Sequence, residues 1–194
     1  MCPSEKQLSW ATCNFPGNSG TGFQKFGFNG LFSTPRHPSV SYRSITDGAT
    51  NTSIFSEWVI GPAAYVKDNP RRFVFATPAP PLLESNDFDA FVKLCRQMTS
   101  EDIRSDPAGK GKSWLRGDFK HTLYNHVISI NGNSCTNSGF VRQGAWTAGS
   151  LHSQGANVVF VDGHSRFIKD SVALTVWRSL GSRNGGEAVS NDSF

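Results

Sequence analysis

The chain has 194 residues, of which 19 are basic and 15 acidic, and 37% are hydrophobic. This length allows one domain with a hydrophobic core, and the spread of the basic residues along the chain argues against a nucleic-acid-binding protein, which gathers its charge into a patch. We therefore expect a single domain over residues 1–194, and its 19 Gly, 10 Pro and 15 Phe favour short strands and turns over a helical bundle.

The first third of the chain predicts a loop followed by a strand. Residues 14–38 alternate glycines with aromatic residues without a period, which predicts an irregular loop lying on the core. Asp47 and Gly48 are a turn signal, and the β-favouring stretch 52–60 follows them. Since both faces of that stretch are largely apolar, we expect a central strand.

A helix is predicted after the Pro-rich break at residues 77–84. Ser85 or Asn86 is the expected N-cap, because their side chains can accept hydrogen bonds from the first free backbone N–H groups. Helical spacing then places one set of apolar residues on the inner face. This set is Phe88, Phe91, Val92, Cys95 and Met98.

Two loops and a pair of strands come next. The segment ending in Gly111-Lys112-Ser113 lacks the glycine spacing of a phosphate-binding loop and reads as a plain basic loop. The tripeptide that begins at Arg116 is taken as a coincidence without functional weight. Residues 122–130 predict strands, and residues 131–134 predict a turn.

The segment from Ala156 to Lys169 predicts a β-hairpin around the turn Asp162-Gly163. A two-residue turn would pair Val161 with His164 and, further along, would bring Phe167 to the core face beside Val158 and Phe160. A short helix capped by Asp170 or Ser171 and ended by Gly181 should follow, and residues 182–194 read as a polar tail.

His152 and Asp162 are separated by nine residues, a spacing that raises the question of a shared metal. In a hairpin they lie at the base and at the tip, up to roughly 20 Å apart. We therefore expect separate structural roles: Asp162 holds the turn, Gly163 adopts the left-handed conformation, and His152 bonds to backbone at the hairpin base.

Asp47, Asn51 and Glu57 offer hard oxygen ligands near one turn, so a structural calcium ion is one interpretation. The preferred interpretation is local: Asp47 and Asn51 make turn hydrogen bonds, and Glu57 pairs with an arginine. We accordingly predict no metal and no cofactor.

The four cysteines, Cys2, Cys13, Cys95 and Cys135, are widely spaced, which indicates two disulfides and an oxidising compartment rather than a zinc site. Spacing alone leaves the connectivity open. We predict Cys95–Cys135, because Cys95 faces inward from its helix and Cys135 follows a tight turn, and Cys2–Cys13, because these two flank a short loop. The first ten residues contain no signal peptide. Free thiols in a cytoplasmic protein are therefore the alternative, but we favour an exported protein whose export segment precedes this sequence.

These elements together predict an α+β fold. One antiparallel twisted sheet carries the packed helix of residues 88–98, with a C-terminal hairpin, a short C-terminal helix and long loops.

Five motifs, in order, resemble a known bacterial family. They are "CPSE", "SITDGATNTSIFSE", "SWLRGDFKHTLYNH", "NGNSC" and "LHSQGANVVFVDGHSRFIKDSVALTVWRSLGSRNGGE". They are similar to the prepilin-type processing-associated H-X9-DG domain proteins, a domain of unknown function (DUF1559) related to the pseudopilins of type II secretion. The family commonly has Ser-Val after Asp-Gly, where this chain has His164-Ser165.

The resemblance implies an extracytoplasmic, envelope-associated or secreted globular domain, whose leader and N-terminal helix precede this sequence. The expected function is a non-enzymatic pilin-like module for assembly or partner binding. Its expected partners are other pilin-like or envelope proteins, with membrane contact only through the missing helix. The alternative is an extracytoplasmic enzyme or small-ligand-binding domain with a pocket near Glu57, His126 and His152.

Overall fold

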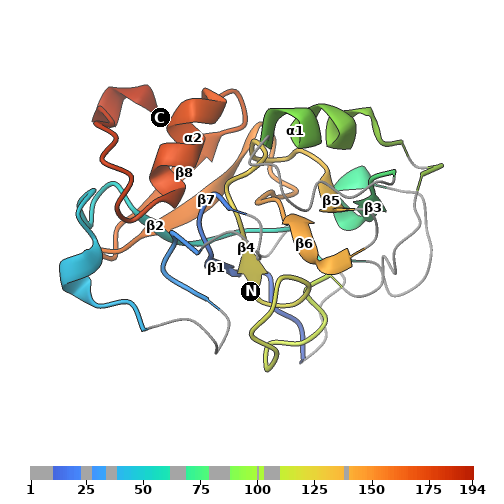
Figure 1. Ribbon diagram of the computed structural model, residues 1–194, viewed down its shortest axis with the longest axis horizontal. Helices are drawn as coiled ribbons and strands as arrows, with labels where there is room; N and C mark the ends of the chain where they lie inside the picture. Colours follow the sequence, from blue (N-terminus) through green and yellow to red (C-terminus); the bar gives the residue numbers. More distant parts are fainter. Residues whose placement is uncertain are drawn as a thin grey trace.

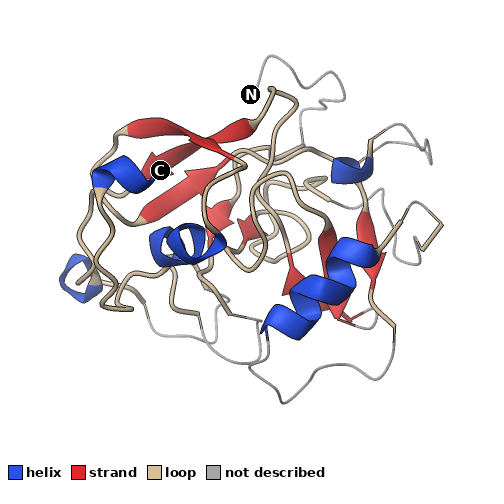
Figure 2. Ribbon diagram, turned by 90° about the horizontal axis from the view of Figure 1, so that it is seen from above, coloured by secondary structure: helices blue, strands red, loops and turns tan. Residues whose placement is uncertain are grey.

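A computed structural model of the chain describes residues 11–22, 28–33, 39–61, 69–78, 88–99, 101–102, 110–137 and 140–194. Within these residues, two α-helices and two β-sheets form the expected α+β fold (Figures 1 and 2). Among the described residues, 3-10 helices add single turns to it. They are η1 (Tyr42–Ser44), η2 (Pro70–Arg72) and η4 (Asn191–Ser193).

The larger sheet has five strands in the order β4-β1-β2-β7-β8. Its neighbours pair antiparallel except β1 and β4, which run parallel. As predicted from its apolar faces, β2 lies at the centre, although the regular strand covers only part of residues 52–60. The bounds are β1 (Gly17–Asn18), β2 (Ser53–Ser56), β4 (Leu123–Tyr124), β7 (Gly155–Phe160) and β8 (Ser165–Lys169).

The smaller sheet has the order β3-β5-β6, with β3 (Val74–Ala76), β5 (Ser134–Asn137) and β6 (Phe140–Ala145). Its strands β3 and β5 are parallel, and β5 and β6 are antiparallel. The prediction of one antiparallel sheet is therefore wrong, since there are two sheets and both are mixed. Alternation of side chains along a strand reports which face is buried, but it carries no information on the direction of a partner strand far away in the sequence.

Each α-helix covers one sheet, and both face the viewer in Figure 2. Helix α1 (Phe88–Gln97) packs Phe91, Val92 and Cys95 toward the smaller sheet, as its helical spacing predicts. The proposed caps Ser85 and Asn86 lie outside the described residues.

Helix α2 (Leu174–Gly181) packs Trp177 and Leu180 into the core of the larger sheet. Its N-cap is Ala173, without a side-chain hydrogen bond, so the prediction of Asp170 or Ser171 as the cap is wrong. The helix begins later than expected, and burial of Trp177 stabilises it in place of a capping side chain.

The predicted hairpin exists, but its register differs by one residue. The N–H of Phe160 donates to the carbonyl oxygen of His164 at 2.9 Å, and the N–H of Gly163 donates to that of Phe160 at 3.0 Å. The loop therefore has three residues, and Gly163, with φ of 92°, ends it in the left-handed region. The shift exchanges the faces of β8, so Ile168 enters the core and Phe167 is 42% exposed, contrary to the prediction.

Residues 182–194 are polar, yet they lie against the body of the molecule. The guanidinium of Arg183 donates to the carbonyl oxygens of Phe28 and Gly30 at 2.8 and 2.7 Å. At the end of the chain, the ring of Phe194 lies 5.9 Å from that of Phe160. The segment therefore covers the hairpin and the loop around residue 30.

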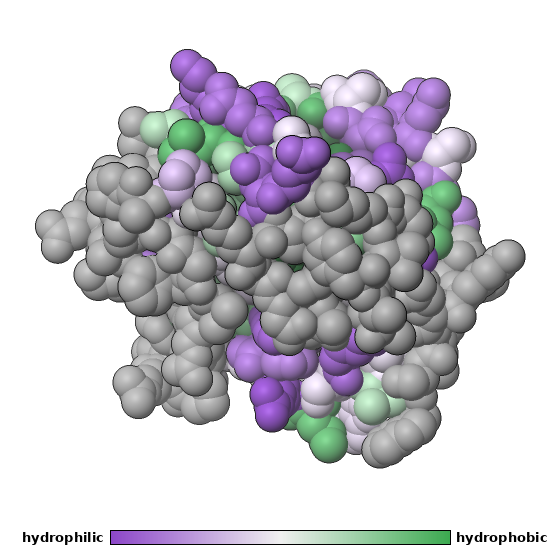
Figure 3. Space-filling model, turned by 90° about the vertical axis from the view of Figure 1, so that its right-hand side faces the viewer, coloured by the Kyte–Doolittle hydropathy of each residue, from purple (hydrophilic) through white to green (hydrophobic). Residues whose placement is uncertain are grey.

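The face at the right of Figure 1 is seen directly in Figure 3, where the described residues at the surface are mainly hydrophilic. Among the described residues, none of the helices has both the length and the apolar character required to cross a membrane.

Candidate functional site

His126 is buried at the centre of a polar cluster below α2. Its ring stacks on that of Trp177 at 3.8 Å, and its Nδ1 lies 2.6 Å from the Trp177 carbonyl oxygen. Its Nε2 lies 2.9 Å from Ser53 Oγ on β2 and 3.0 Å from the hydroxyl of Tyr124 on β4. Since a carbonyl can only accept, Nδ1 carries the proton and Nε2 accepts from a hydroxyl.

Burial dominates the electrostatics of this cluster. It lowers the pKa of His126 to about 3, with the Trp177 carbonyl opposing that shift, and the imidazole is neutral at physiological pH. Burial also raises the pKa of Tyr124, against a smaller effect of its hydrogen bond to Ser53. Both groups are therefore uncharged hydrogen-bonding partners.

Asn18 and Gly181 close the cluster on either side. The Asn18 amide donates to the Ser53 carbonyl oxygen and to the Gly181 carbonyl oxygen, both at 2.9 Å. A Cβ at Gly181 would lie 2.4 Å from the imidazole of His126, so only glycine fits there. The cluster thus joins β1, β2, β4 and α2 through one histidine.

A serine hydroxyl in contact with a histidine nitrogen is the arrangement that nucleophilic catalysis uses. Here Ser53 and His126 each have none of their surface exposed, and Nδ1 bonds to a carbonyl rather than a carboxylate. Solvent and substrate do not reach Ser53 Oγ in this conformation. The geometry is that of a satisfied buried network.

Glu57 and His152 form a second, separate cluster. Glu57 is almost fully buried, and its Oε2 accepts from the backbone N–H of Asn157 at 2.8 Å and from the Asn157 amide at 3.1 Å. His152 Nε2 lies 3.6 Å from Glu57 Oε1. The prediction of an arginine partner for Glu57 is wrong, because its partners are Asn157 on β7 and His152 at the base of the hairpin.

The structure therefore brings together two of the three residues of the predicted pocket. His152 is 41% exposed and stands over Glu57, whereas His126 bonds within its own sealed cluster. The surface hollows beside β8 and α2, beside α1, and at Asp47 contain none of the three.

Asp47 clamps the C-terminal segment. Its carboxylate accepts from the backbone N–H groups of Gly185 at 2.8 Å and Gly186 at 2.9 Å. The prediction of a local turn bond from Asp47 is wrong, because its carboxylate bonds to residues far along the chain. The turn at Asn51 is closed by its backbone N–H, which donates to the Gly48 carbonyl oxygen at 3.1 Å, and not by its side chain. Both side chains line a surface hollow of about 580 Å³, and Glu57 does not. Among the described residues, no three His, Cys, Asp or Glu side chains are grouped to hold a metal ion.

The hairpin tip is a local structure. Asp162 Oδ1 accepts from the backbone N–H of His164 at 3.1 Å and lies 2.6 Å from its Nδ1, contacts that lower the pKa of Asp162. His152, at the other end of β7, donates from its backbone N–H to Ser150 Oγ. The two residues thus make separate contacts.

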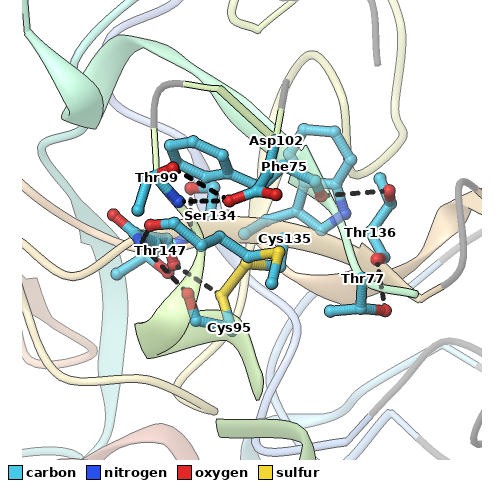
Figure 4. The surroundings of a disulfide bond; sticks show 12 residues. Phe75, Thr77, Cys95, Thr99, Asp102, Ser134, Cys135, Thr136 and Thr147 are labelled. Atoms are coloured by element: carbon cyan, nitrogen blue, oxygen red, sulfur yellow. Dashed lines mark hydrogen bonds between the residues drawn. A yellow bond between two sulfur atoms is a disulfide. The ribbon is translucent and has the colours of Figure 1, made fainter. Parts of the chain in front are cut away.

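The disulfide between Cys95 and Cys135 joins α1 to β5, with 5.9 Å between the Cα atoms (Figure 4). This prediction is confirmed.

Cys13 is a free thiol in the part of the chain that the structure describes, so the predicted Cys2–Cys13 disulfide is wrong. The position of Cys13 is fixed by its backbone N–H, which donates to Gly111, and by its carbonyl oxygen, which accepts from the Trp58 ring. These contacts are distant in sequence, so the short separation between Cys2 and Cys13 did not predict them. Cys2 lies outside the described residues.

Sequence reasoning missed Lys110, which belongs to the predicted basic loop but is buried. Its Nζ donates to Ser134 Oγ at 3.0 Å and to the Arg71 carbonyl oxygen at 3.2 Å, and it lies 5.3 Å from the centre of the Trp58 ring. Desolvation, followed by the charge of Arg72, lowers the pKa of Lys110 to about 7. A lysine flanked by glycines carries no sequence signal of burial.

Comparison with known proteins identifies a family. A family described as a protein of unknown function (DUF1559) matches residues 3–175. No curated protein and no solved structure matches the chain.

Proposed function

Because the chain belongs to the DUF1559 family of proteins of unknown function, we propose that it is a non-enzymatic, pilin-like module of the cell envelope. The finer assignment to the H-X9-DG proteins and to relatives of the pseudopilins is part of this proposal. Its work is assembly with, or binding of, other pilin-like or envelope proteins.

The Cys95–Cys135 disulfide carries the proposal. Both cysteines are fully buried between α1 and the smaller sheet, where they belong to the hydrophobic core. A structural disulfide closing 40 residues is typical of proteins that fold in an oxidising compartment. An exported domain fits this chemistry better than a cytoplasmic enzyme does.

The candidate sites offer further support. The polar groups that looked catalytic in sequence bond to one another inside the fold: His126 to Trp177, Ser53 and Tyr124, and Glu57 to Asn157. Buried networks in which every group has a hydrogen-bond partner make a core rigid, which favours a structural role for these side chains over a catalytic one. Of the three residues of the predicted pocket, the competing class, an extracytoplasmic enzyme or ligand binder, keeps only Glu57 and His152 together.

A test in the native cell separates the two classes. The full-length gene product, tagged at its C-terminus, should fractionate with the envelope, and mapping of non-reduced peptides should show Cys95 joined to Cys135. Cross-linking of intact cells should recover an envelope protein. A cytoplasmic protein with four free thiols would contradict the proposal, as would a catalytic activity that disappears in His152→Ala and Glu57→Gln.

A further inference from the structure

A short loop that leads into β4 presents its tip to solvent. The tip consists of Trp114, Leu115, Arg116 and Gly117, all exposed. Trp114 is 54% exposed and Leu115 is 73% exposed, although most large apolar side chains of the described residues are buried. The loop is the olive segment at the lower edge of the molecule in Figure 1. Two adjacent large apolar side chains at a protruding tip indicate an interaction site.

The loop is held in shape from below. Its neck is closed by the N–H of Gly111, which donates to the Lys120 carbonyl oxygen at 2.9 Å. The N–H of Trp114 donates to the carbonyl oxygen of Ala11 at 2.9 Å, and Phe119 is buried at the end of the loop. These bonds fix the backbone of the loop, and in this conformation both apolar side chains of the tip are exposed.

The charge of the loop is basic. Lys112 and Arg116 flank the apolar pair, and no carboxylate of the described residues is within ion-pair distance of either. The acid in the loop, Asp118, is engaged by His121 Nδ1 at 2.5 Å. The loop thus places two cations, the exposed Arg116 and the half-buried Lys112, close in sequence to two exposed apolar side chains. This composition matches a lipid bilayer with anionic headgroups.

The shape of the tip decides between a membrane and a protein partner. A stable protein interface needs roughly 20–30 residues from each side, whereas this tip exposes four residues in a row. A bilayer requires no matching pocket. Tryptophan is enriched at the level of lipid headgroups, and each Lys or Arg near an anionic surface strengthens binding by roughly fivefold.

We propose that the tip Trp114–Gly117 binds the surface of an anionic lipid bilayer. Trp114 and Leu115 enter the headgroup region, and Lys112 and Arg116 contact lipid phosphates. This inference goes beyond the assembly role and does not rest on it, because it adds a membrane contact made by the globular domain itself. Binding through so few groups is weak and salt-sensitive.

The experiment is flotation of the purified protein with vesicles of phosphatidylcholine alone or mixed with phosphatidylglycerol. The wild type should float with the anionic vesicles at low salt and dissociate as salt rises. Trp114→Ala with Leu115→Ala should lower the partition coefficient by on the order of tenfold or more, because the inserted apolar groups are lost. Lys112→Gln with Arg116→Gln should lower it by roughly fivefold per charge.

Matched controls keep the result specific. Lys93→Gln with Arg96→Gln removes the same two charges from the exposed face of α1, and Tyr42→Ala removes a 72% exposed aromatic elsewhere; both should bind like the wild type. Thermal melts should show all variants folded. Equal loss in the two charge variants would show that net charge alone binds the vesicles and would overturn the proposal. The proposal would also be overturned if the protein did not bind vesicles. A protein partner captured through Trp114 and Leu115 in the absence of vesicle binding would overturn it as well.

Discussion

Lys110 shows how a single side chain can contradict its sequence context. The run of glycines and lysines around it suggests a solvated loop, but its ammonium group contacts Ser134, the Arg71 carbonyl oxygen and the Trp58 ring. These partners lie 24, 39 and 52 residues away in the chain. No local pattern reports such contacts, and so the burial of this lysine could not be predicted.

Lys110 should make stability depend on pH. Burial lowers its pKa from 10.5 to about 7, so between these values the unfolded chain binds a proton that the folded chain does not. The free energy of unfolding should therefore rise from pH 7 toward pH 10 and be smaller below pH 7. Urea unfolding at pH 6, 7.5 and 9 measures this dependence. Lys110→Met should flatten it, and an unchanged slope in that variant would contradict the assignment.

At the scale of elements, the sequence predicts α1, the central position of β2 and the existence of the C-terminal hairpin. These are the elements whose signals are local: helical spacing, an apolar stretch after a turn, and Asp-Gly between alternating segments. The register predicted for the hairpin was wrong, because Asp-Gly also fits a three-residue loop. Backbone bonds from Val161 and Asp162 to residues that precede β2 hold that loop.

The hairpin tip should tolerate Asp162→Asn and not Gly163→Val. The asparagine oxygen can still accept the His164 N–H, so the first change should be nearly silent. Gly163 has φ of 92°, and no described atom lies within 4 Å of a Cβ built there. The cost of valine is thus backbone strain, about 1–2 kcal/mol or more. Urea unfolding measures both. Equal stability of Gly163→Val and the wild type would show that another loop conformation exists.

At the scale of the molecule, the His126 cluster is the part of the candidate site that sequence could not assemble. Tyr124 and His126 are near neighbours, but Asn18, Ser53 and Trp177 come from distant parts of the chain. Their meeting depends on the parallel pairing of β1 with β4, which no local pattern encodes. For the same reason, the predicted pocket of Glu57, His126 and His152 split into two clusters.

His126→Ala should destabilise the whole molecule by about 3–5 kcal/mol. The change removes a buried ring, leaves a cavity beside Trp177 and takes the acceptor from Ser53 and Tyr124. His164→Ala is the matched control, since that ring is 41% exposed and stacks on the buried Phe160. The two variants are compared by urea unfolding at pH 7.5. Similar stabilities would mean that the cluster is not a support of the fold.

The pairing of β2 with β7 has a consequence for how the chain folds. Glu57 bonds to a residue 100 positions later, and Asn18 bonds to one 163 positions later. A chain emerging from a ribosome or a translocation pore holds β2 long before β7 exists, so the edge of β2 that pairs with β7 stays unpaired until residue 160 has appeared. Folding of the larger sheet is thus postponed to the end of synthesis or transport, and topology of this kind slows it further. In the interval, the early strands are exposed to aggregation, which makes the chain a candidate client of holding chaperones.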